Sequence, residues 1–150
     1  MAEPDIEAFA KQPWMATASD GGLAIPEDGP TVHARYYGTF PRKIRRYALD
    51  RGVISLEHAI RSMTSLPAQI LGLQDRGVLR EGAMADIAVL DLDRLTDKAT
   101  FLDPHQHSEG VEYVLVNGQV VVDRGQPTGK LAGAALRKEP LARGTRGTIP

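Results

Sequence analysis

The strongest constraint on the fold is a hairpin signal in the second half of the chain. Two runs rich in β-branched and aromatic residues, 112–116 and 119–122, are separated by Asn117-Gly118. Asn-Gly is typical of a two-residue type I′ turn, since both positions need a positive φ. A further apolar run bounded by aspartates, 85–91, predicts another strand. We therefore expect a small β-sheet unit from residue 76 onward.

The first half of the chain has the period and the capping signals of helices. Helices are predicted at 4–11 and at 40–51, where Pro41 is interpreted as a residue of the first turn. A third is predicted to start after Ser55, as its N-cap, and a fourth to end at Gly72. The basic residues of the second helix, including Lys43, are expected to form a solvent-exposed face.

Between the first two helices lies a run of small and β-compatible residues, 14–19, which ends in Asp20. We interpret this run as a buried strand that presents Asp20 at its C-terminal end. Gly21 and Gly22 would then supply the positive φ of a sharp turn. Catalytic side chains of parallel α/β enzymes lie at the C-terminal ends of strands, so Asp20 is a candidate catalytic residue.

Residues 21–38 are rich in glycine and proline and are predicted to form a loop. A loop of this length in a compact domain is usually functional or mobile. It carries His33, Arg35, Tyr36 and Tyr37. From these residues alone, a polar loop with its aromatic side chains packed on the body of the protein is the favoured interpretation.

Composition excludes several classes of function. The formal net charge of −1 gives no field that would attract nucleic acid or an anionic membrane. There is no cysteine, hence no disulfide framework and no thiolate nucleophile. The sequence contains neither a signal peptide nor an apolar run of the ~20 residues that span a bilayer. We expect a cytoplasmic protein without nucleic-acid or membrane partners.

The histidines do not predict a metal site or a catalytic triad. His105 and His107 form an H-x-H pair, which could bind a metal from one face of a strand. Two histidines alone do not fill a zinc site, and the neighbouring Pro104 argues for a loop. The other two histidines, His33 and His58, are scattered, and His58 is expected at the surface.

Several motifs together nevertheless resemble a known family. They lie at 18–21, 33–42, 63–68, 103–106 and 113–118, with the sequences ASDG, HARYYGTFPR, MTSLPA, DPHQ and YVLVNG. This pattern resembles the C-terminal part of the D-aminoacylases (N-acyl-D-amino-acid deacylases), a branch of the amidohydrolase superfamily. The resemblance covers roughly residues 5–138.

The resemblance implies an α/β fold that is the C-terminal fragment of a TIM-like barrel. A complete barrel takes ~250 residues, so the chain can supply only the last strand and neighbouring helices. It implies three parts: the end of the barrel at 1–75, part of a small β-sandwich domain at 76–138, and a disordered tail at 139–150.

The resemblance also implies a zinc-dependent hydrolase that cleaves the linear amide of a small-molecule N-acyl amino acid. The family's zinc-ligand histidines and cysteine lie upstream of the matching region, and its H-x-H motif does not map onto His105 and His107. Zinc therefore belongs to the full-length family, with most ligands absent from this chain. The isolated chain is expected to be inactive.

Two site residues carry over by position. Asp20 matches the aspartate that acts as general base on the metal-bound water and returns the proton to the leaving nitrogen. The same carboxylate is also a candidate metal ligand. Arg35 matches the arginine that binds the substrate carboxylate through its guanidinium fork. Ala34 stands where the family has a proline.

Two alternatives stay open. The chain could be a non-catalytic remnant or interaction module that binds a partner, or itself, through unpaired strand edges. Among enzymes, a dihydropyrimidinase-like hydrolase of cyclic amides is the alternative, against which the segment around Arg35 argues.

Overall fold

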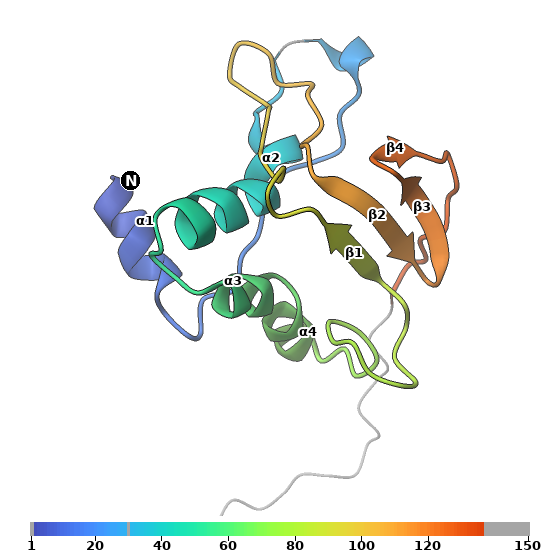
Figure 1. Cartoon of the computed structure of the whole chain (residues 1–150). Helices are drawn as coiled ribbons and strands as arrows, with labels where there is room; N and C mark the ends of the chain where they lie inside the picture. Colours follow the sequence, from blue (N-terminus) through green and yellow to red (C-terminus); the bar gives the residue numbers. More distant parts are fainter. Residues whose placement is uncertain (1, 30, 137–150) are drawn as a thin grey trace, which may run out of the picture.

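A computed structural model of the chain describes residues 2–29 and 31–136, so the predicted tail at 139–150 lies outside the described residues. Helices and an antiparallel sheet lie side by side (Figure 1). Two long loops, around residue 29 and around residue 105, meet beyond the first turn of the second helix. The mixed helical and β architecture expected from the sequence is confirmed at this level.

The helices occupy most of the first half, as predicted. They are α1 (Glu3–Ala10), the short 3₁₀ turn η1 (Pro26–Asp28), α2 (Arg35–Arg42), the π-helix η2 (Lys43–Asp50), α3 (Leu56–Met63) and α4 (Ser65–Leu71). The Ser55 hydroxyl caps α3 by accepting a bond from the His58 N–H at 3.1 Å. Gly72 ends α4 in the left-handed conformation, with φ 75°. No helix of the described residues is long and apolar enough to cross a membrane.

The second helix differs from its prediction. It begins at Arg35 rather than at residue 40, so Pro41 lies inside α2 and not in its first turn. Proline has no N–H to bond the carbonyl four residues earlier, which here is that of Tyr37. The Ser108 hydroxyl donates to this carbonyl instead, at 3.1 Å. Beyond Pro41 the helix continues as the wider η2.

The helical part packs around a small core where α1, η2 and α3 meet. Its buried members are Ala10, Tyr47, Ile54 and Ala59, and Ile6, Ala48, Val53 and Met63 pack against them. The prediction that His58 lies at the surface was wrong. Its side chain is half-buried, with Nε2 2.9 Å from the carbonyl oxygen of Ala10, so it links α3 to the end of α1.

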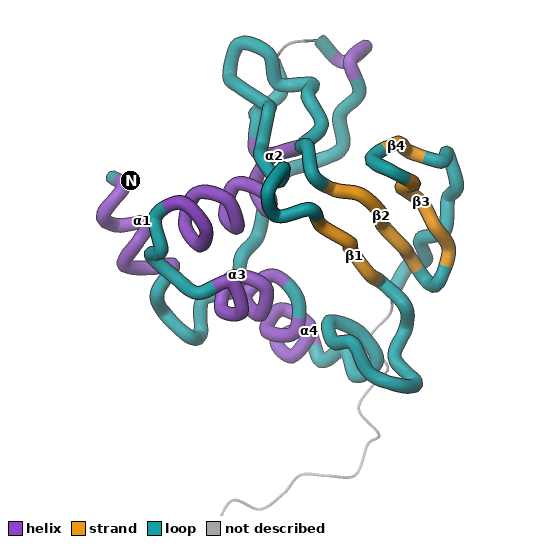
Figure 2. The backbone as a smooth tube through the Cα atoms, viewed as in Figure 1, coloured by secondary structure: helices purple, strands orange, loops and turns teal. Residues whose placement is uncertain are grey.

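The sheet has four antiparallel strands in chain order (Figure 2). They are β1 (Ile87–Leu90), β2 (Val111–Val116), β3 (Gln119–Asp123) and the very short β4 (Gln126–Pro127). Asn117 and Gly118 join β2 to β3 with φ of 49° and 79°, as the type I′ turn requires. The predicted hairpin is therefore confirmed. Every position of β2 is half-buried, so neither face of the sheet is fully covered within the described residues.

The strand predicted at 14–19 is not formed. Trp14 lies in a turn, and residues 15–19, which follow as an extended segment, pair with no described strand. Within the part of the chain that the structure describes, their one backbone hydrogen bond to another element joins the Thr17 N–H to the Ser62 carbonyl at 2.8 Å. A strand is stabilised by a ladder of such bonds to a neighbour, and sequence alone does not reveal whether that neighbour is present.

A charged network anchors the base of the hairpin. The Asn117 N–H donates to Asp86 at 2.8 Å, and Arg76 bonds both the Asp86 carboxylate and the Asn117 side-chain oxygen, the latter at 2.8 Å. The Asn117 N–H, assisted by Arg76, holds the pKa of Asp86 below its usual range, against a smaller opposing effect of burial.

Asp86→Asn is expected to lower the free energy of unfolding by about 1–2 kcal/mol, measured by urea denaturation near neutral pH, because it weakens these charge-assisted bonds. A carboxyl with a lowered pKa in the folded chain contributes in full above the ordinary aspartate pKa, about 3.9. The contribution is lost as the pH falls toward the lowered value. Stability of the wild type should thus drop more steeply in acid than that of Asp86→Asn. The exposed Asp93→Asn is the control, and an equal effect of both substitutions would contradict the assignment.

Candidate functional site

The structure brings the two predicted site residues together. The Arg35 guanidinium Nη2 lies 3.1 Å from the Asp20 carboxylate Oδ2. The Asp20 side chain is 85% exposed and that of Arg35 41%, so the pair lies at the surface of the described chain. A carboxylate and a guanidinium are thus within direct reach of each other at the start of α2.

The backbone around Asp20 turns differently from the prediction. Asp20 itself takes the left-handed conformation, with φ 50°, which aspartate tolerates better than most residues. Gly21 and Gly22 are not in this region, so their predicted role was wrong. A Cβ at Gly21 would lie 3.2 Å from the Tyr36 Cα, and one at Gly22 would lie 3.3 Å from the Tyr36 hydroxyl. The glycines let the chain pass close against Tyr36.

Arg35 is placed by the first turn of α2. Its backbone N–H donates to His33 Nδ1 at 3.0 Å, which closes the turn before the helix. A cavity of about 410 Å³ opens beside it. Polar lining residues of this cavity include His33, Arg35, Thr39, Arg42, Asp97 and Thr100. Arg42 is paired with Asp97 at 3.0 Å, so the cavity carries both signs of charge.

His105 and His107 lie against Tyr37, not around a metal position. The His105 ring is bonded on both sides: Nδ1 is 2.8 Å from the Tyr37 hydroxyl and Nε2 is 2.9 Å from the Gly29 carbonyl oxygen. His107 meets the same tyrosine ring edge-on, with centroids 5.4 Å apart. Both nitrogens of His105 are therefore engaged in holding loops together.

The described residues do not by themselves fit a zinc site. No group of three or more His, Cys, Asp or Glu side chains within 2–29 and 31–136 is placed to hold a metal ion. Asp20, the candidate ligand, faces the cation of Arg35.

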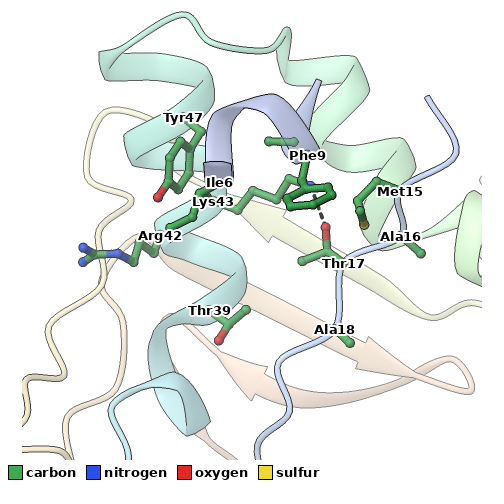
Figure 3. A pocket seen from close by; sticks show the side chains of 11 residues that line it. Ile6, Phe9, Met15, Ala16, Thr17, Ala18, Thr39, Arg42, Lys43 and Tyr47 are labelled. Carbon is green, nitrogen blue, oxygen red and sulfur yellow. Dashed lines mark hydrogen bonds between the residues drawn. The ribbon is translucent and has the colours of Figure 1, made fainter. Parts of the chain in front are cut away.

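Sequence reasoning missed Lys43. It was predicted on an exposed basic face, but only 9% of the residue is accessible. Its amine donates to the Thr17 hydroxyl at 2.5 Å and to the Ser62 hydroxyl at 2.7 Å, and burial lowers the pKa of Lys43. Lys43 also lines an apolar cavity of about 560 Å³ between α1, the extended segment and the second helix (Figure 3). Its position four residues before the core residue Tyr47 was the available signal.

Comparisons with known proteins identify the family of the chain. A model of the "Amidohydrolase family" matches residues 4–122. The chain belongs to this family. The N-acyl-D-glutamate deacylase of Alcaligenes xylosoxydans xylosoxydans is 37% identical over 139 residues, which make up 93% of this chain and 28% of the relative. The resemblance to the D-aminoacylase branch is confirmed.

Solved structures of amidohydrolases share the fold. A crystal structure of D-aminoacylase matches with a TM-score of 0.80 and 37% identity, over 89% of this chain and 27% of that chain. The N-acyl-D-glutamate deacylase from Bordetella bronchiseptica, complexed with zinc and a phosphonate mimic of the tetrahedral intermediate, matches with a TM-score of 0.74 and 36% identity, over 85% and 27%. A dihydroorotase from Lactobacillus gasseri is less similar, with 26% identity in an alignment that covers 81% of this chain and 30% of the relative. The chain spans less than a third of the length of these relatives.

Proposed function

We propose that this chain supplies part of the active site of an N-acyl-D-amino-acid deacylase. Residues 1–75 would correspond to the end of a TIM-like barrel and 76–138 to part of the small β-domain. Supporting this division, the chain matches D-aminoacylase structures over 27% of their length with TM-scores up to 0.81. The observation that carries the proposal is the Asp20–Arg35 pair, in which a carboxylate and a carboxylate-binding group lie 3.1 Å apart.

The reaction is hydrolysis of a linear amide. Water adds to the amide carbonyl, the C–N bond breaks, and the products are a carboxylate and a free D-amino acid. In our proposal the Asp20 carboxylate accepts a proton from the attacking water and returns it to the leaving nitrogen. Its wide exposure and its position after an extended segment leave it accessible to substrate.

Arg35 is proposed to bind the substrate carboxylate. A guanidinium matches a carboxylate with two parallel hydrogen bonds, which fixes the orientation as well as the position of the ligand. The existing contact with Asp20 shows that a carboxylate can approach this guanidinium in the folded chain. The cavity beside Arg35 provides room for the rest of the substrate.

A metal would polarise the amide and activate water in such a hydrolase. The Bordetella relative was solved with zinc. The described residues lack a ligand cluster, so they do not by themselves hold such a metal.

A non-catalytic interaction module is the second candidate. It is favoured by the extended segment 14–19, whose backbone makes a single hydrogen bond to another element within the described chain. Unpaired backbone of this kind can accept a strand from a partner or from a second copy.

The isolated chain is expected not to release D-amino acid, because its described residues supply no metal-ligand cluster. N-acetyl-D-glutamate is the substrate, zinc is added, and free D-glutamate is measured by a coupled oxidase assay. Zinc-dependent turnover by the purified 150-residue chain would contradict this expectation.

Asp20→Asn should reduce kcat by at least about 10³-fold in a zinc-loaded enzyme that contains this chain, since the amide cannot accept a proton from water. Bound zinc, measured by mass spectrometry, should stay nearly unchanged. Loss of zinc together with activity would instead make Asp20 mainly a metal ligand.

Arg35→Ala should raise KM for N-acyl amino acids about tenfold or more, with a smaller change in kcat, because it removes substrate binding. Arg35→Lys keeps the charge but not the guanidinium fork, so its KM should lie between those of the wild type and Arg35→Ala. The free energy of unfolding should change by less than about 1 kcal/mol, because the lost ion pair is exposed. An unchanged KM would refute the assignment.

A further inference from the structure

His105 connects two segments that are far apart in the sequence. It lies in the loop between β1 and β2, while its partners Tyr37 and Gly29 belong to α2 and to the loop after Asp20. The Tyr37 hydroxyl also lies within hydrogen-bond distance of the Ala24 carbonyl oxygen, at 3.0 Å. We name residues 21–29 the site loop, because they lead directly away from Asp20. One histidine and one tyrosine thus bond this loop at both Ala24 and Gly29.

The protons of this cluster can be assigned from the acceptors. The Gly29 carbonyl can only accept, so His105 Nε2 must carry a proton whatever the state of Nδ1. Tyr37 has one hydroxyl proton, which reaches either the Ala24 carbonyl or His105 Nδ1. The bond to Gly29 is therefore the constant contact of His105, and it restrains the far end of the site loop.

The same β1–β2 loop also holds the backbone of α2. Pro41 leaves the Tyr37 carbonyl without its helical donor, and the Ser108 hydroxyl fills that place at 3.1 Å. Further along, the Phe101 ring meets His33 edge-on with centroids 5.0 Å apart. The β1–β2 loop therefore contacts the site loop and the first turn of α2, which flank the Asp20–Arg35 pair.

We propose that His105 is a positioning residue that holds the site loop against Tyr37 and so fixes the relative positions of Asp20 and Arg35. It contacts neither residue of the pair. Its effect passes through Gly29 and through Tyr37, which lies in the same helical turn as Arg35. The effect on catalysis rests on the proposed function, whereas the effect on the loop does not.

The loop is tested in the full 150-residue chain by amide hydrogen exchange of peptides covering 21–29. His105→Ala should raise exchange there about five- to tenfold and leave the β2–β3 hairpin unchanged. His105→Gln, whose amide can donate to Gly29, should restore most of the protection. His107→Ala, which removes only a ring contact, is the matched control. Equal loosening by the two alanine variants, or none by His105→Ala, would overturn the proposal.

A spectroscopic measurement on the wild-type chain tests the contact between His105 and Gly29 even if His105→Ala folds poorly. In the wild-type chain, the His105 Nε2–H should appear in nitrogen-proton spectra as a slowly exchanging proton, assigned by its loss in His105→Gln. Tyr37→Phe should leave this signal in place, because the Gly29 bond does not pass through the hydroxyl. A ring whose Nε2 carries no observable proton would refute the assigned contact.

Activity then separates this inference from the proposed function. In a zinc-loaded enzyme that contains this chain, His105→Ala should raise KM severalfold, and His105→Gln should recover it. A loosened loop with an unchanged KM would retain His105 as a loop restraint but reject its positioning of Asp20 and Arg35, whereas the role of Arg35 in binding substrate is decided separately by Arg35→Ala. An unchanged loop would reject the positioning role whatever the activity.

Discussion

The position of Asp20 depends on a buried lysine. The extended segment that leads to Asp20 has no neighbouring strand in the described chain, and it is held by Lys43 through Thr17. The same amine bonds Ser62 of α3, and the Ser62 carbonyl accepts the Thr17 N–H. Burying an amine costs free energy unless its hydrogens find acceptors, and here two hydroxyls provide them. This small polar cluster thus holds the extended segment in place, as the hydrogen bonds of a neighbouring strand would in a sheet.

The helix formed by α2 and η2 connects this cluster to the helical core and to the segment after β1. Arg35 lies in its first turn, and Tyr47 enters the core between α1 and α3. Arg42 pairs with Asp97, and Arg45 donates to the Leu92 carbonyl at 3.1 Å, so the helix also contacts the segment after β1. One continuous helix therefore sets the position of the site residues relative to both the helical core and the sheet unit.

Local signals predicted local structure well. Ser55 and Gly72 marked helix ends, and Asn117-Gly118 marked the hairpin, because capping and turn chemistry act within a few residues. The prediction of a strand at 14–19 was wrong because a strand needs a neighbouring strand to pair with, and composition does not reveal whether one is present. The start of α2 was misplaced because a proline is typical of the first turn of a helix, whereas Pro41 lies inside α2.

The site was less predictable from residues alone than from family resemblance. Nothing in the spacing of Asp20 and Arg35 places them in contact, since fourteen residues separate them in the sequence. Their proximity arises because α2 begins at Arg35 and the intervening loop folds back onto Tyr37. His105 was considered only as a metal ligand, since a histidine that holds two loops has no sequence signature of its own.

The contact between Asp20 and Arg35 imposes a condition on the proposed chemistry. A substrate carboxylate that binds Arg35 competes with Asp20 for the same donors. The binding event that anchors the substrate would thereby release Asp20 from the guanidinium. Since the pair is exposed, separating it costs at most about 1 kcal/mol, so the exchange opposes substrate binding only weakly.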